Sequence, residues 1–254
     1  MIMSTTTTVT PMIMPTEGPA TAARGDDLAL LGLLQLVSPA LPIGAFAFSQ
    51  GLESAFELGW VSDEASLGEW LEGVLEDGLT RCELPVLARL ARAWQESDGE
   101  AIARWDAWLA ASRETAELAA EDRRLGAALV RLLGSLSLLP GGSTSTTGEA
   151  PALPADAGYV TVFAWTAHAR GVSTRQALLG FAWAWLENQL AVACKALPLG
   201  HTAAQRLVER LRPALVGAVD EALALEDEAL GPALPGLALA SALHETQYSR
   251  LFRS

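Results

Sequence analysis

Residues 173–197 read STRQALLGFAWAWLENQLAVACKAL and predict a helix that is apolar on nearly every side. Ser173 and Gln176 form a capping box, which starts a helix by satisfying its first backbone N–H groups. A helix without a polar face belongs in a protein core or in a membrane. Ionisable groups are costly in a membrane, so the triplet at 187–189 and Lys195 favour the core. The stretch therefore predicts a central helix packed on most sides by other helices.

The polar residues of this helix allow two interpretations. Glu187, Asn188 and Gln189 fan across about 200° of one turn, and Asn188 shares a stripe with Lys195. Buried polar groups must find partners, so the first interpretation is a structural hydrogen-bond cluster that locks helix packing. The second is a polar patch or passage needed for function. The scarcity of unpaired buried charge in proteins favours the first.

Composition restricts the class of protein. The 254 residues are half hydrophobic and rich in Ala and Leu, which predicts helices around a sizeable core. A net charge of −13 opposes direct binding to nucleic acid or to anionic membranes. Cys82 and Cys194 are too few for a disulfide framework and indicate a reducing compartment. With neither a secretory signal nor a spanning segment in the sequence, we expect a cytoplasmic protein.

The expected fold class is all-α: a single-domain bundle of about ten helices around the central apolar helix, with no strand. Residues 1–26 are rich in Thr and Pro and are expected to form a disordered tail, followed by a first helix from Leu28. Residues 27–254 are expected to form the domain. Within it, the segment 140–156 is rich in Gly, Ser, Thr and Pro and reads as a flexible linker, and 244–254 form a C-terminal tail.

Two stretches before the linker have distinct patterns. Residues 38–53 contain prolines and glycines that forbid a continuous helix, yet their apolar side chains predict a loop packed on the core. Residues 112–133 predict a long helix of mixed charge, in which Glu117, Glu121 and Arg124 form one stripe. We interpret that stripe as a solvated face with weak ion pairs.

After the central helix, the sequence predicts a second capping box and a break. Thr202 and Gln205 have the capping-box spacing, so a helix is expected to start there. Pro213 is expected to interrupt that helix, because proline lacks the N–H that a helix interior uses.

The sequence shows no recognisable catalytic or metal-binding pattern. The one lysine, Lys195, follows Cys194, which excludes a P-loop. His168, His201 and His244 are scattered singly, and no CxxC, HxH, HExxH or GxSxG is present. We therefore expect no catalytic residue, no intrinsic metal centre and no cofactor, which favours a binding or scaffold role.

Four stretches together resemble the urease accessory protein F family (UreF). They are SPALPIGAFAFSQGLESAFELGWV at 38–61, SRETAELAAEDRRLG at 112–126, WLENQLAVACKALPLGHTAAQRL at 185–207 and HETQYSRLFRS at 244–254. The resemblance implies an all-helical homodimer that is not an enzyme. It implies a complex with a second accessory protein, called D or H, and with a GTPase, called G. That complex delivers nickel to the active site of urease, and the F component governs the engagement of the GTPase.

The resemblance also implies residue roles. Lys195 corresponds to a family lysine implicated in the GTPase interaction. Further partner-binding candidates are two groups, one acidic and one in the tail: Glu53, Glu117 and Glu121; Tyr248, Arg250, Phe252 and Arg253. The sequence departs from the family pattern at Leu243, where a basic residue is frequent, and at 45–48, which is usually more polar.

Two alternatives follow from these patterns. The tail at 244–254 either caps the last helix and packs on its own subunit, or stays mobile until the D/H partner orders it; the resemblance favours the second. For the function, the alternative to a nickel-delivery scaffold is an all-helical enzyme that uses the polar cluster from Glu187 to Lys195.

Overall fold

The computed structural model describes residues 19–139, 151–197 and 199–253, and every regular element in these ranges is helical. The all-α prediction is confirmed for this part of the chain. In order, the α-helices and the short 3-10 helices (η) are α1 Pro19–Leu36, η1 Ala45–Ala47, α2 Leu52–Glu57, α3 Glu64–Asp77, η2 Leu79–Arg81, α4 Glu83–Glu96, α5 Gly99–Ala111, α6 Ala116–Ser135, α7 Tyr159–Ala169, α8 Thr174–Ala196, α9 His201–Ala224, η3 Asp227–Ala229 and α10 Pro235–His244.

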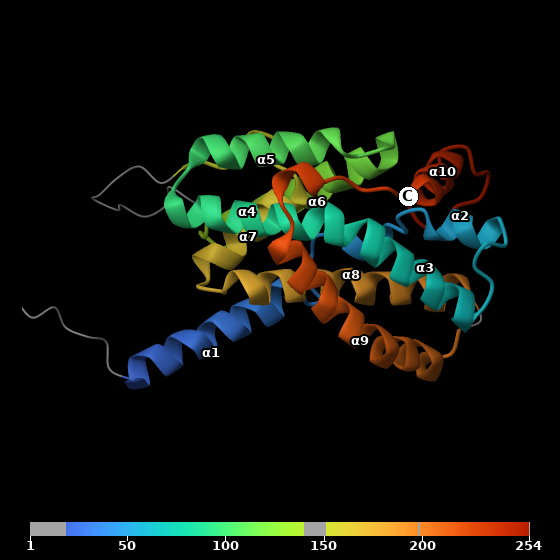
Figure 1. Cartoon of the computed structure of the whole chain (residues 1–254), viewed down its shortest axis with the longest axis horizontal. Helices are drawn as coiled ribbons and strands as arrows, with labels where there is room; N and C mark the ends of the chain where they lie inside the picture. The colour runs from blue at the N-terminus through green and yellow to red at the C-terminus, as the bar shows by residue number, and fades with distance from the viewer. Residues whose placement is uncertain (1–18, 140–150, 198, 254) are drawn as a thin grey trace, which may run out of the picture.

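Helices α4, α7 and α8 contribute much of the core, and α7, which packs against α1, α4, α5, α6 and α8, is buried from Val160 to Ala167 (Figure 1). Helix α8 packs against α1, α2, α4, α7 and α9, and α4 packs against α5, α7, α8 and α9. The predicted capping box of α8 is present, with Ser173 Oγ accepting from the Gln176 N–H at 3.4 Å. No helix of the described residues is long and apolar enough to cross a membrane.

The loop at 38–53 lies against the core, as predicted. Ile43 and Phe48 are buried, and η1 forms a single turn between them. Helices α2 and α10 pack together at one end of the molecule, where the C-terminus also lies (Figure 1). The loop therefore leads from the interior of the bundle directly to that end.

Some predicted boundaries are wrong for identifiable reasons. Helix α1 begins at Pro19, so residues 19–26 are helical and the predicted disordered tail is too long. Proline suits the first position of a helix, and the alanines after it are strong helix formers. Helix α6 starts after Thr115, which caps it, rather than at residue 112. The predictions for residues 1–18 and 140–150 fall outside the described residues.

Helix α9 corrects two further predictions. It starts at His201 after Gly200, so Thr202 and Gln205 form no capping box, and it continues through Pro213. The proline removes one backbone hydrogen bond, but the buried side chains of Leu211 and Leu215 pack on both sides of it. Packing of the apolar face thus holds the helix together across the proline.

Helices α6 and α7 approach each other closely at Gly126. A Cβ atom at this position would overlap the carbonyl oxygen of Ala157 and lie 2.9 Å from the carbonyl carbon of Gly158. Both groups belong to the backbone that leads into α7, and they cannot rotate away as a side chain can. Only glycine therefore permits this helix pair to pack as it does.

Gly126→Ala should lower the free energy of unfolding by about 1–3 kcal/mol through this overlap. The matched control is Gly73→Ala in α3, where the added Cβ meets no atom within 4 Å. That control should gain up to about 1 kcal/mol from helix propensity. Urea unfolding of both variants measures the difference, and equal effects would contradict the close approach.

Candidate functional site

The chain after α10 is held on the bundle by one buried carboxylate. Glu53, on α2, is 3% exposed. It accepts the backbone N–H groups of Leu251 at 2.7 Å and Phe252 at 3.0 Å, and the side-chain amide of Gln247 at 3.3 Å. The carboxylate of Glu53, a predicted partner-binding residue, is thus already hydrogen-bonded to the tail of its own chain.

A buried histidine joins this carboxylate to a second one. The Nε2 atom of His244 lies 3.2 Å from Glu53, and its Nδ1 atom lies 2.8 Å from Glu117 on α6. Arg250 donates to Glu117 at 2.9 Å and also to the carbonyl groups of Glu245 and Gln247. Glu117 therefore belongs to an ion-pair network with the tail, and the prediction that it lies on a solvated face is wrong.

Lys195 and the loop before α2 hold the last residues. The Nζ atom of the exposed Lys195 lies 4.5 Å from the ring centroid of the buried Phe252, within cation–π range. It also donates to the Leu251 carbonyl at 3.5 Å. The backbone N–H of Arg253 donates to the carbonyl of Ala47 at 2.7 Å. We call residues 245–253, held in this way, the docked tail; it packs on its own chain, as in the first of the two alternatives.

The docked tail presents two large hydrophobic side chains to solvent. Tyr248 is fully exposed, and Leu251 is 56% exposed although its backbone is anchored on both sides. Exposed aromatic and aliphatic groups on a fixed backbone are suited to binding a partner, because little conformational freedom is lost when the partner arrives. The tail candidates Arg250 and Phe252 instead hold the tail in place.

The polar residues of α8 do not form one cluster. Asn188 Nδ2 donates to the carbonyl of Phe48 at 3.2 Å, and Gln189 Nε2 donates to Gln50 Oε1 at 3.0 Å. Lys195 lies apart from them at the docked tail. Asn188 and Gln189 thus make structural hydrogen bonds, as the first interpretation predicted, but Lys195 does not join them, and the alternative of an enzyme site that uses a cluster from Glu187 to Lys195 loses its basis.

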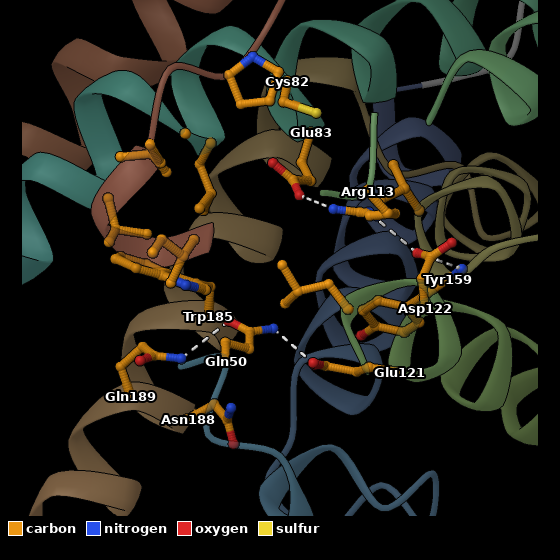
Figure 2. Close-up of a pocket in the computed structure, with 18 of the residues that line it drawn as sticks. Gln50, Cys82, Glu83, Arg113, Glu121, Asp122, Tyr159, Trp185, Asn188 and Gln189 are labelled. Carbon is orange, nitrogen blue, oxygen red and sulfur yellow. Dashed lines mark hydrogen bonds and ion pairs between the residues drawn. The ribbon is translucent and has the colours of Figure 1, made fainter. Parts of the chain in front are cut away.

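Glu121 lies in a different place, on a cavity of about 150 Å³ between α3, α4, α6, α7 and α8. We call it the interior cavity. Figure 2 shows Gln50 between Glu121 and Gln189; its amide donates to Glu121 Oε1 at 2.7 Å. Burial raises the pKa of Glu121 to about 8. Glu121 is thus an interior residue, and only Arg124 of the predicted stripe is exposed.

A second group of charges lines the cavity opposite Gln50. Arg113 pairs with Glu83 and, at 3.2 Å, with Asp122 (Figure 2). Burial, reinforced by the charge of Glu83, raises the pKa of the neighbouring Cys82 thiol to about 12. Burial also raises the pKa of Asp122. Arg113 thus offsets only part of the charge of the two carboxylates, and the raised pKa keeps Cys82 an unreactive thiol.

Several residues that hold the docked tail or line the interior cavity were not predicted from the sequence. His244, Gln50, Arg113 and Asp122 lie inside the stretches that resemble the UreF family, and that resemblance is the signal that could have singled them out. Within the described residues, no group of three or more His, Cys, Asp or Glu side chains is placed to hold a metal ion.

The described residues define an all-helical protein whose tail is fixed on its own bundle, with Tyr248 and Leu251 exposed. Comparison with known proteins gives its family. The UreF family profile matches residues 61–212. Relatives described as urease accessory protein UreF are 74% identical over 228 residues in Psychrobacter cryohalolentis (90% of this chain, 95% of the relative) and 48% identical over 227 residues in Hahella chejuensis (89% and 99%).

The chain belongs to the UreF family of urease accessory proteins. The relative from Marinobacter nauticus, of the same description, is 71% identical over 230 residues, which are 91% of this chain and 96% of the relative. The resemblance seen in the four sequence stretches is thereby confirmed. The chain is accordingly an accessory protein and not an enzyme.

Glu53→Gln should release the tail while leaving the bundle folded. The amide of Gln cannot accept charge-assisted bonds from both backbone N–H groups, so hydrogen exchange at Leu251 and Phe252 should become faster. Glu57→Gln, on the exposed surface of the same helix, is the control and should change neither amide. Unchanged exchange in the Glu53 variant would show that the carboxylate does not hold the tail.

Glu121→Gln should stabilise the protein in a pH-dependent manner. The pKa of Glu121 in the folded state, about 8, lies above the ordinary glutamate pKa of about 4.5, so between these two pH values the folded state binds a proton that the unfolded state does not. The free energy of unfolding therefore falls as pH rises through this window, and Gln removes that loss. Urea unfolding should give a stability gain about 2–4 kcal/mol larger at pH about 8 than at pH about 5; a pH-independent difference would contradict it.

Proposed function

We propose that this chain is a non-catalytic scaffold for maturation of the nickel centre of urease, bridging the D/H accessory protein and the G-type GTPase. Family membership supports a role in the urease accessory system. The observation that carries the bridging role is the docked tail, which holds Tyr248 fully exposed beside Leu251. In this proposal the chain regulates GTP-dependent nickel delivery, and the urease apoprotein is reached through the complex.

The geometry supports a division of roles among the candidate residues. Tyr248 and Arg253 are exposed and are proposed to contact the D/H protein directly. Glu53, Glu117, Arg250 and Phe252 are proposed to act by positioning them, through the contacts described above. Lys195 is exposed at the edge of the tail and is proposed to contact the GTPase. Glu121 faces the interior cavity and is therefore not proposed to contact a partner protein.

The proposal extends to the whole chain. Residues 27–254 are proposed to belong to one accessory domain, which α1 extends back to Pro19. The segment 140–156 is proposed to be an excursion within it, since the flanking helices α6 and α7 pack against each other. Two such chains are proposed to form a homodimer that works in the cytoplasm without a tightly bound nickel ion of its own.

The double variant Tyr248→Ala with Leu251→Ala tests the proposal. Both side chains are exposed, so the fold should be kept, whereas loss of two interface anchors should weaken binding to the D/H protein by about 30-fold or more. Size-exclusion chromatography with light scattering measures the complex, and circular dichroism the fold. Leu223→Ala, exposed on α9, is the control. Normal assembly by the double variant would exclude the docked tail as the binding surface.

A further inference from the structure

The interior cavity has polar atoms without partners. Among the described residues, Glu121 Oε2, Asn188 Oδ1 and Arg113 Nε are buried and make no hydrogen bond. Glu121 is 4% and Asn188 6% exposed, and all three residues line the cavity. A buried polar atom without a hydrogen-bond partner destabilises the folded state, and a ligand that supplies the partner removes this cost. Asn188 Oδ1 is an acceptor, and Glu121 Oε2 becomes one when its carboxyl is ionised, so a cationic ligand with hydrogen-bond donors would satisfy both atoms.

The charged side chains that line the cavity favour a ligand with a positive charge. Four carboxylate side chains line the cavity, whereas Arg113 is the one guanidinium there and is paired with two of them. Glu121 has no cationic partner; its one hydrogen bond comes from the neutral amide of Gln50. Figure 2 shows the Glu121 side chain pointing toward Gln50, and Glu121 is among the residues that line the cavity. A buried carboxylate in this position is stabilised by a cation.

The remaining walls select an organic cation over a metal ion. Trp70, Tyr159, Phe181 and Trp185 line the cavity. Aromatic faces attract organic ammonium and guanidinium groups, whereas a metal ion requires several ligand atoms converging on one point. The volume of about 150 Å³ is roughly ten times the ~10–15 Å³ that admits one water molecule. A molecule of several heavy atoms therefore fits.

We propose that the interior cavity binds a small organic cation of the guanidinium or primary ammonium class. One N–H of the cation donates to Glu121 Oε2 and another to Asn188 Oδ1, while the aromatic side chains cover its faces. When the cation binds, the Glu121 carboxyl releases its proton to solvent and becomes ionised; it remains ionised while the cation is bound. Other titratable or charged groups that line the cavity are Cys82, Glu83, Arg113, Glu114, Asp122 and Tyr159.

Calorimetric titration of the full chain with guanidinium chloride, at low millimolar concentration and constant ionic strength, tests the site. Urea is the neutral probe of the same shape. Guanidinium should bind saturably, and urea should bind about tenfold or more weakly, because it lacks the charge. Titrations at pH about 7 in buffers of different ionisation enthalpy should show release of about one proton per guanidinium, since Glu121 is mostly protonated before binding.

Three variants make the test specific to Glu121. Glu121→Gln should bind guanidinium about tenfold or more weakly and release no proton. Glu121→Asp keeps the charge and should retain binding. Glu187→Gln, one residue before Asn188 but outside the cavity lining, should bind as the parent does. Absence of saturable binding by the parent, equal binding of urea, or unchanged binding by Glu121→Gln would each overturn the proposal.

Discussion

The buried carboxylate of Glu53 must be surrounded by hydrogen-bond donors, and the chain supplies these from its last residues. A carboxylate left unpaired in the interior would cost several kcal/mol. Helix α2 can therefore keep its packed position only while the tail covers Glu53. The tail, in turn, has few apolar side chains of its own to bury and depends on this carboxylate and on Phe252. Helix α2, α10 and the tail thus form one unit of structure.

The segment from Phe48 to Glu53 connects this unit with the interior cavity. Gln50 and Gly51 both have positive φ angles, of 52° and 79°. This conformation is uncommon for a residue with a Cβ atom, and Gln50 is held in it by side-chain bonds toward α6 and α8. Three residues later, Glu53 anchors the tail. The shape of the cavity and the position of the tail are therefore set by the same short turn.

Features that depend on near neighbours in the sequence were predictable. The capping box of α8, its apolar character and the packed loop at 38–53 follow from residues close together. The polar contacts were not predictable, because their partners are distant: Glu121 bonds to Gln50, 71 residues away, and Glu53 bonds to Phe252, 199 residues away. A stripe of charges on a helix looks the same whether solvent or another segment faces it. Pro213 is the opposite case. Proline normally interrupts a helix, but α9 continues through it because the apolar side chains on either side pack against the core.

The sequence contains one lysine, and the fold places it against the tail. All other basic side chains of the chain are guanidinium or imidazole groups, which amine-acylating reagents leave unmodified under mild conditions. Such a reagent would find a single side-chain amine, and its ammonium group lies over an aromatic ring while the tail is docked. Lys195 is thus the one side-chain amine of the sequence, and its place at the proposed binding surface suits it to cross-linking or to attaching a spectroscopic label without any engineered residue.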